Sequence, residues 1–316
     1  MRFKLDFAFN SSCQISIQNS QLMMGSCFAE EIGQLLTKHR FDVTVNPHGV
    51  IFNPLTLAGL LSRYVTSAAY AETDILQHQE RYYSLQHHGR FSSDIKDELL
   101  QRMNDALYLG STAVQRSEAV LITFGSAWVY TYLTSGDTVA NCHKLPAQLF
   151  SKRLLSVSEL TDAWQPVLQA LKKVNKQVVF TVSPVRYIRD GLHENNISKS
   201  VLQLSVHELC SQFDHVHYFP AYEIVSDELR DYRFFKEDLV HPNQQAITYV
   251  FERFVQTSCT PHTQQAVADI RAWLLMQEHR PVGYNMPEQT AFIQKRQHTA
   301  EALHQKYPFL GDRGIS

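Results

Sequence analysis

The chain has 316 residues, 44% of them hydrophobic, so it can bury a sizeable core without relying on disulfides or a metal. Its 29 basic and 31 acidic residues give a net charge of −2 and form no extended basic block, which argues against nucleic acid as a partner. No apolar run approaches the roughly 20 residues needed to span a bilayer.

The N-terminal residues 1–10 alternate apolar and polar side chains, so they lack the unbroken apolar core of a signal peptide. We expect an edge strand or arm there, and a cytoplasmic protein. The five cysteines show no C-x-x-C spacing, which predicts reduced thiols rather than a disulfide framework or a closed zinc site.

A strand-turn-helix pattern stands early in the chain. The apolar run 22–24 breaks at Gly25, Ser26 follows, and helical periodicity begins over about 27–39. At such a turn a hydroxyl is held clear of the sheet, and the N–H groups that open the helix face any anion formed beside it. Ser26 is therefore our candidate nucleophile.

The rest of the chain mostly alternates strands and helices. Strands are predicted at about 41–45, 119–124, 177–182 and 216–219, with a hairpin at 129–133 and 138–140. Helices are predicted at about 54–67, 93–109, 156–174, 197–212 and 242–257, and in a tail at 262–277 and 287–305. The stretch 72–92 reads as a loop with possible hairpin strands. This order predicts a mostly parallel sheet covered on both faces.

Polar turns follow several predicted strands, and ligands of such sheets bind beyond the carboxyl ends of the strands. Turns at Gly25-Ser26, 46–54, Gly125-Ser126 and 183–195 should therefore converge on one edge. Two Asn-Pro steps bracket Gly49 in the second of these turns and resist regular structure.

An Asp-x-x-His step, Asp238 to His241, precedes the helix at 242–257. Its carboxylate can fix the tautomer of the imidazole, which would make His241 the general base for Ser26. Cys27 is the rival nucleophile, because thiol pKa values fall at helix N-termini. His215 and His217 share a strand face, but they lack further ligands at helpful spacing, so we predict no metal.

Together these residues resemble the GSCFA family. The resemblance spans roughly residues 20–255 and rests on the following motifs: Gly25-Ser26-Cys27-Phe28-Ala29, Asn46-Pro47-x-Gly49, Phe52-Asn53-Pro54, Gly125-Ser126-Ala127-Trp128-Val129-Tyr130, Asn141-Cys142-His143-Lys144, Ser183-Pro184-Val185-Arg186, Asp190-Gly191, Ser198-Lys199 and Asp238-Leu239-Val240-His241-Pro242. That family is similar to the SGNH hydrolases. The resemblance implies a three-layer α/β/α flavodoxin-like domain, which we place over 1–260, and we expect a helical extension over 261–316 to pack on or near it.

The resemblance also implies a serine esterase or acyltransferase site without a cofactor. Ser26 matches the nucleophile, Asp238 and His241 match its partners, and Gly49 matches the oxyanion-hole glycine. The asparagine expected after Gly125 is absent, so either Asn141 or Ser126 would serve as a donor beside the N–H groups of Ser26 and Gly49.

Four further polar residues lie near the predicted edge and are candidates for substrate binding: Asn53, His143, Arg186 and Asp190. Asn53 also suits a loop brace. Arg186, Arg189 and Asp190 could grip a carboxylate, phosphate or sugar hydroxyl of a substrate, or an Arg–Asp pair among them could order their loop. Trp128 and Tyr130 suit either a sugar-stacking wall or a buried hairpin.

Three hypotheses of function follow. The first is hydrolysis or transfer of an acyl ester of a small molecule or carbohydrate. The second is a catalytically silent carbohydrate- or metabolite-binding domain, suggested by the missing asparagine. The third is an assembly role for the helical tail, with a homo-oligomer as its product.

Overall fold

The computed structural model describes residues 5, 7–9, 11–278 and 286–313. The strand or arm predicted over 1–10 falls largely outside the described residues. In the described part of the chain, no helix combines the length and the apolar character that crossing a membrane requires.

The centre of the described fold is a five-stranded sheet in which every neighbouring pair of strands is parallel. Its strands are β1 (Ser20–Gly25), β2 (Asp42–Val45), β6 (Ser117–Phe124), β10 (Gln177–Val182) and β11 (Val216–Tyr218). They lie in the order β2-β1-β6-β10-β11. Counted along the chain this is 2-1-3-4-5, the flavodoxin-like order, which confirms the predicted fold class.

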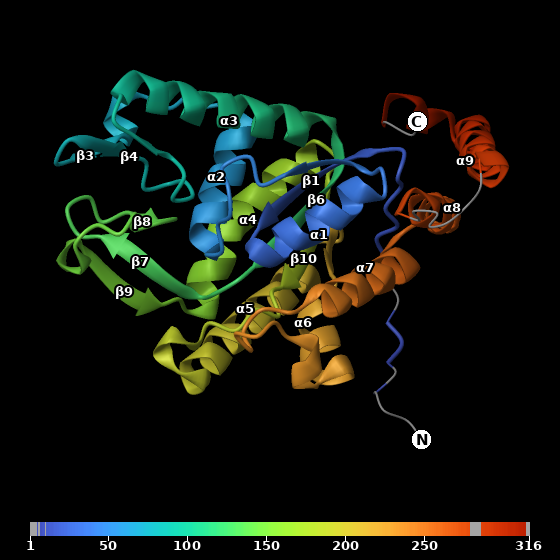
Figure 1. Cartoon of the computed structure of the whole chain (residues 1–316). Helices are drawn as coiled ribbons and strands as arrows, with labels where there is room; N and C mark the ends of the chain where they lie inside the picture. The colour runs from blue at the N-terminus through green and yellow to red at the C-terminus, as the bar shows by residue number, and fades with distance from the viewer. Residues whose placement is uncertain (1–4, 6, 10, 279–285, 314–316) are drawn as a thin grey trace.

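Helices cover both faces of the sheet (Figure 1). The long helices are α1 (Cys27–Lys38), α2 (Pro54–Thr66), α3 (Lys96–Arg116), α4 (Val157–Lys173), α5 (Leu192–Gln212) and α7 (Gln244–Ser258). Leu22 and Met24 of β1 belong to the hydrophobic cluster of α2, α3, α4 and α5, whereas Met23 belongs to that of α1 and α7. Alternate residues of one strand thus face opposite helical layers, as the pleat requires.

Two small antiparallel sheets are attached to this core. One consists of β3 (Leu76–His78), β4 (Arg81–Tyr83) and β5 (Ser92–Ser93), and the other of β7 (Trp128–Tyr132), β8 (Thr138–Val139) and β9 (Phe150–Leu154). The first confirms the hairpin strands within 72–92. The β7–β8 hairpin is also confirmed, and it lies beside the end of the central sheet where β6 stops (Figure 1).

Some elements differ from the sequence prediction. Strand β9 was missed because Lys152 takes a half-buried position between Phe150 and Leu154 and interrupts the apolar alternation, and its pairing with β7 decides its conformation. Helix α5 begins at Leu192, inside the predicted loop, because buried Asn195 accepts a hydrogen bond from the Tyr187 N–H at 2.9 Å and orders that turn. The short α6 (Ala221–Glu223) and the π-helical turn Ile224–Leu229 were also missed.

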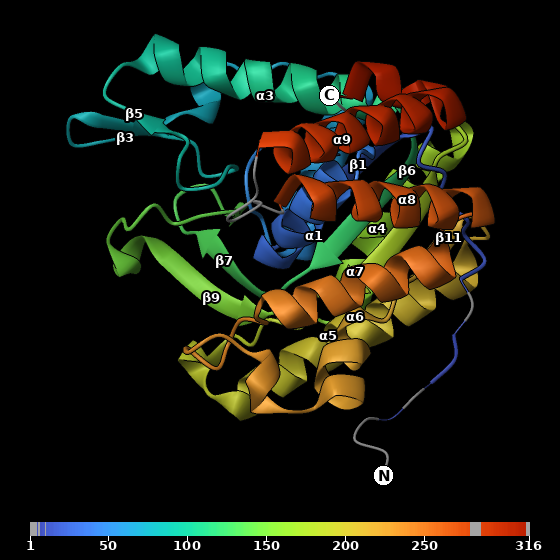
Figure 2. The same cartoon turned by 45° about the vertical axis from the view of Figure 1, so that its right-hand side comes forward.

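The tail consists of α8 (Pro261–Glu278) and α9 (Met286–Lys306), followed by the 3₁₀ turn Pro308–Arg313. Figure 2 shows α7, α8 and α9 side by side over α1. Trp273 of α8 and Leu303 of α9 lie in the same hydrophobic cluster as α1 and α7. Arg313 donates to the carbonyls of Ile17 and Arg40, so the described end of the tail is tied to the core.

Candidate active site

Ser26 lies where β1 ends and α1 begins. It is the N-cap residue of α1, with extended backbone angles, and its side chain makes no capping hydrogen bond. Gly25 has φ +140, and a Cβ atom there would overlap the backbone of Thr123 in β6, so only glycine permits this close turn. The strand order reverses between β1 and β6, which places Ser26 at the topological switch point of the sheet.

The hydroxyl of Ser26 is buried, and its Oγ has no hydrogen-bond partner among the described residues. A Cβ atom built on Gly125 would stand 3.4 Å from Ser26 Cβ and 2.6 Å from Phe52 Cβ. The missing side chain of Gly125 therefore lets Phe52 and Ser26 approach this backbone closely. A buried, unpaired hydroxyl is costly in a folded protein, and a catalytic role is one of the explanations for such an exception.

Asp238 and His241 form a local pair on the turn before α7. Asp238 Oδ2 lies 2.7 Å from His241 Nδ1, and its Oδ1 accepts the N–H groups of His241 at 3.0 Å and Val240 at 2.9 Å. These N–H groups, with the imidazole, hold the pKa of Asp238 down at about 2. The carboxylate is therefore ionised at neutral pH and favours the His241 tautomer that carries its proton on Nδ1.

The turn is anchored on two sides. Lys236 Nζ pairs with Glu31 Oε1 of α1 at 2.9 Å. From the loop after β10, Arg186 donates its N–H to the Val240 carbonyl at 3.3 Å and its Nη1 to the Leu239 carbonyl at 3.2 Å. These contacts fix the turn beside the helix that Ser26 opens. In the described chain, however, no hydrogen bond joins Ser26 Oγ to the imidazole of His241.

The two backbone donors expected in the oxyanion hole are engaged within the fold. The Ser26 N–H donates to the Thr123 carbonyl at 3.2 Å, and the Gly49 N–H donates to the Asn46 carbonyl at 2.8 Å. Gly49 has φ +81 and closes the tight turn of its loop. In this conformation neither N–H is free to meet a ligand.

The two side-chain candidates differ in their contacts. Ser126 Oγ lies 3.2 Å from Ser198 Oγ and accepts the Trp128 N–H at 3.1 Å, so it braces its own loop. Asn141 Oδ1 accepts the His143 N–H at 2.7 Å, whereas Asn141 Nδ2 makes no hydrogen bond with the described residues. Of the two side chains, Asn141 has the donor that is still available.

Two of the predicted substrate-binding residues have structural partners. Asn53 caps α2 by accepting the Thr56 N–H at 2.9 Å, and its Nδ2 donates to the Val139 carbonyl at 3.1 Å. Asp190 forms an ion pair with Lys152 of β9. Asn53 thus braces its loop, whereas the acid of the predicted Arg–Asp pair is bound by a lysine of β9 instead.

Arg186 and His143 are also engaged. The Arg186 guanidinium stacks 4.2 Å from the centroid of the Phe235 ring while it donates to the turn described above. His143 Nε2 lies 2.7 Å from the Ser84 carbonyl, and burial lowers the pKa of this imidazole. Asn53 and His143 nevertheless line a cavity of about 440 Å³, whose wall includes Phe52 but not Ser26, Asp238 or His241.

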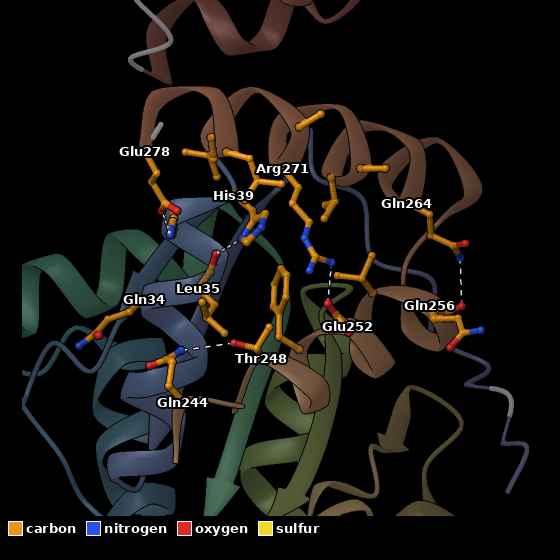
Figure 3. A pocket seen from close by; sticks show the side chains of 18 of the residues that line it. Gln34, Leu35, His39, Gln244, Thr248, Glu252, Gln256, Gln264, Arg271 and Glu278 are labelled. Atoms are coloured by element: carbon orange, nitrogen blue, oxygen red, sulfur yellow. Dashed lines mark hydrogen bonds and ion pairs between the residues drawn. The ribbon is translucent and has the colours of Figure 1, made fainter. Parts of the chain in front are cut away.

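A larger cavity of about 780 Å³ lies between α1, α7 and α8 (Figure 3). An ion pair between Arg271 and Glu252 joins α8 to α7 across it, at 2.5 Å. Its wall includes Glu31 and Gln244, but Ser26, Asp238 and His241 do not line it. We therefore place the candidate chemistry at the switch point rather than in the larger cavity.

The pKa of the Cys27 thiol is shifted in the opposite direction to the one that its position at a helix N-terminus suggested. Burial raises the pKa of the thiol and outweighs the backbone N–H groups of Phe28 and Cys27, which lower it. The thiol is thus less ready to form a thiolate than a free cysteine. This weakens Cys27 as a rival to Ser26.

The sequence reasoning missed Lys199 as a residue of this site. Its side chain is buried, and its Nζ donates to the carbonyls of Gly125 and Ser183, each at 2.7 Å. Burial lowers the pKa of Lys199 to about 7. Two signals were available: the Ser198-Lys199 motif, and the position of Lys199 on α5 in register with the apolar face that carries Leu202 and Val206.

The predicted absence of a metal site was based partly on His215 and His217. In the described residues, no group of three or more His, Cys, Asp or Glu side chains could hold a metal ion. His215 Nε2 contacts the Leu168 carbonyl at 3.1 Å, and His217 contacts Gln177 Oε1 at 2.8 Å and Ser12 Oγ at 2.7 Å.

Comparison with known families gives one match. The model of the GSCFA family matches residues 20–254, which include every predicted catalytic residue. No curated protein and no solved structure matches the chain.

Proposed function

The chain belongs to the GSCFA family, and from this premise we propose that it is a serine-dependent ester hydrolase or O-acyltransferase with an SGNH-like site. One observation carries the proposal. A buried hydroxyl without a partner, Ser26 Oγ, stands at the switch point of the sheet, and the Asp238–His241 pair is anchored beside the helix that Ser26 opens.

The mechanism assigns one role to each residue. Ser26 Oγ attacks the carbonyl carbon of an ester while His241 Nε2 takes the hydroxyl proton, and Asp238 stabilises the imidazolium. The same proton passes to the leaving alkoxide. Water or an acceptor hydroxyl then resolves the acyl-enzyme, again with His241 as base. The proposal requires Ser26 Oγ and His241 Nε2 to come within hydrogen-bond reach when the ester binds, since catalytic hydrogen bonds often tighten only in the complex.

The oxyanion needs donors as well. Asn141 Nδ2 is our assignment for the side-chain donor, because the hydroxyl of Ser126 is engaged by Ser198 and Trp128. Losing one such donor typically lowers the rate by about 10²–10³.

Covalent labelling with a fluorophosphonate and hydrolysis of p-nitrophenyl acetate test the proposal. We expect wild-type protein to be labelled and Ser26→Ala to be unlabelled, with loss of nearly all turnover, up to about 10⁶-fold. Asp238→Asn should lower turnover by up to about 10⁴-fold, because the imidazole loses its orienting carboxylate.

Cys27→Ala is the matched control, one residue from the nucleophile, and it should retain both labelling and turnover. A wild-type protein that takes no label, or Ser26→Ala with undiminished activity, contradicts the proposal. Loss of activity in Cys27→Ala alone would transfer the nucleophile's role to the thiol.

A further inference from the structure

The cavity of about 440 Å³ lies between the β7–β8 hairpin, the segment 141–150 and the loop before α5. It adjoins the candidate nucleophile through Phe52, which lines the cavity. The Phe52 carbonyl accepts the Gly125 N–H at 2.8 Å, and Gly125 stands against Ser26. The cavity wall is therefore joined to the serine turn through Phe52 and Gly125, although Ser26 itself does not line the cavity.

The charged groups in the cavity wall are all of one sign. Lys144 and Arg189 line the cavity, and no Asp or Glu does. Neither Lys144 nor Arg189 makes a hydrogen bond or ion pair with the described residues. The nearest acid in sequence, Asp190, is already neutralised by Lys152. Two unpaired cations thus approach one cavity from different segments of the chain.

One wall of the cavity is aromatic and held in place. Trp128, Tyr130 and Tyr187 line it. Trp128 Nε1 donates to the Glu194 carbonyl at 3.3 Å, which fixes the indole. Lys152 Nζ lies 4.7 Å from the Trp128 ring centroid and 5.3 Å from that of Tyr187, although Lys152 itself does not line the cavity. Lys152 Nζ also lies 5.7 Å from the Tyr130 ring centroid, so it occupies one face of each ring and leaves the opposite face for a flat ligand.

We propose that this cavity binds a small ring-bearing molecule with a phosphate or carboxylate group, the anion held by Arg189 and Lys144 and the ring by Trp128 and Tyr130. Its volume is at the small end of the roughly 300–1,000 Å³ of ligand pockets, which suits one substituted ring rather than a polymer. Arginine and lysine bind such anions through charge-assisted hydrogen bonds. That this molecule is the acyl donor or acceptor rests on the proposed function, whereas its binding does not.

Calorimetric titration of full-length Ser26→Ala, which cannot turn over an ester by the proposed route, tests the binding. The probes are phenyl phosphate, benzoate and neutral benzyl alcohol. At least one of the two anions should bind about tenfold or more tightly than benzyl alcohol, since a charge-assisted hydrogen bond contributes on that scale. The stronger of the two identifies the anion as phosphate or carboxylate.

Arg189→Gln, added to Ser26→Ala, should weaken the anion about tenfold and leave benzyl alcohol unchanged. Arg153→Gln is the matched control: Arg153 is an exposed arginine of β9 that pairs with Glu159 and does not line the cavity. Equal affinity for benzyl alcohol and both anions, or an unchanged affinity in Arg189→Gln, overturns the inference. Anion binding by a protein that takes no fluorophosphonate would refute the esterase proposal and leave the cavity assignment standing.

Discussion

Replacing Lys199 with methionine tests the physical account of the switch point. The change keeps the length of the side chain but removes the group that donates to the carbonyls of Gly125 and Ser183, at the ends of β6 and β10. Each buried carbonyl left without a donor costs about 1–3 kcal/mol. This loss should be present at every pH, because a neutral amine donates as well.

Whereas the two hydrogen bonds of Lys199 stabilise the fold, its positive charge destabilises the fold, and this second effect depends on pH. Burial lowers the pKa of the Lys199 side chain from 10.5 to about 7 in the folded protein. At 1.36 kcal/mol per pKa unit, the charged form destabilises the folded state by up to about 5 kcal/mol. The two carbonyl acceptors favour the charged form, so this figure is an upper bound. Between pH 7 and 10.5 the unfolded chain binds more protons than the folded one, so this group makes wild-type protein more stable as the pH rises.

Urea unfolding at pH 7.5, 8.5 and 9.5 measures the effect. The free energy of unfolding of wild type minus that of Lys199→Met should increase by up to about 1.4 kcal/mol per pH unit, so the variant is most destabilised at the highest pH. Lys176→Met is the control: Lys176 also donates to two carbonyls, those of Gln115 and Ser117, but it is only partly buried and should show a smaller slope. A difference that stays constant across this range refutes the reasoning.

Two further predictions concern stability. Burial lowers the pKa of His48 to about 3 and that of His87 well below its usual value, so the free energy of unfolding should fall as the pH drops from about 6.5 towards 4. Urea unfolding at pH 4.5 and 7 should show a smaller fall for His87→Phe than for wild type. An equal fall in the two proteins contradicts this prediction. A Cβ on Gly110 would overlap the Tyr64 ring, so Gly110→Ala should lose about 1–3 kcal/mol. The matched control is Gly59→Ala, whose new Cβ faces open space on α2, and its free energy of unfolding should increase by about 0.5–1 kcal/mol. Thermal unfolding compares the two variants, and equal melting temperatures would refute the packing argument.

The local signals in the sequence were enough for most of the fold. Apolar runs such as 119–124 and helical periodicity such as that over 156–174 depend on residues close in the chain, and β6 and α4 formed where they predicted. The turn that presents Ser26 was readable for the same reason, since Gly25 breaks the strand within one residue. The contact between Asp238 and His241 was also readable, because residues three apart on a turn meet without help from the rest of the fold.

Other features depended on segments far apart in the chain. The Thr123 carbonyl accepts the N–H group of Ser26, and no motif around Ser26 indicates that partner. Arg186 braces the turn before α7 because the loop after β10 lies against it.

The sequence alone therefore determined the succession of the main strands and helices along the chain, and the candidate nucleophile with its Asp–His pair. Only the tertiary structure decided which donors are free and which thiol or amine is desolvated, as Cys27 and Lys199 show. The physical reason is that hydrogen-bond partners and burial are supplied by distant segments that meet only when the sheet closes.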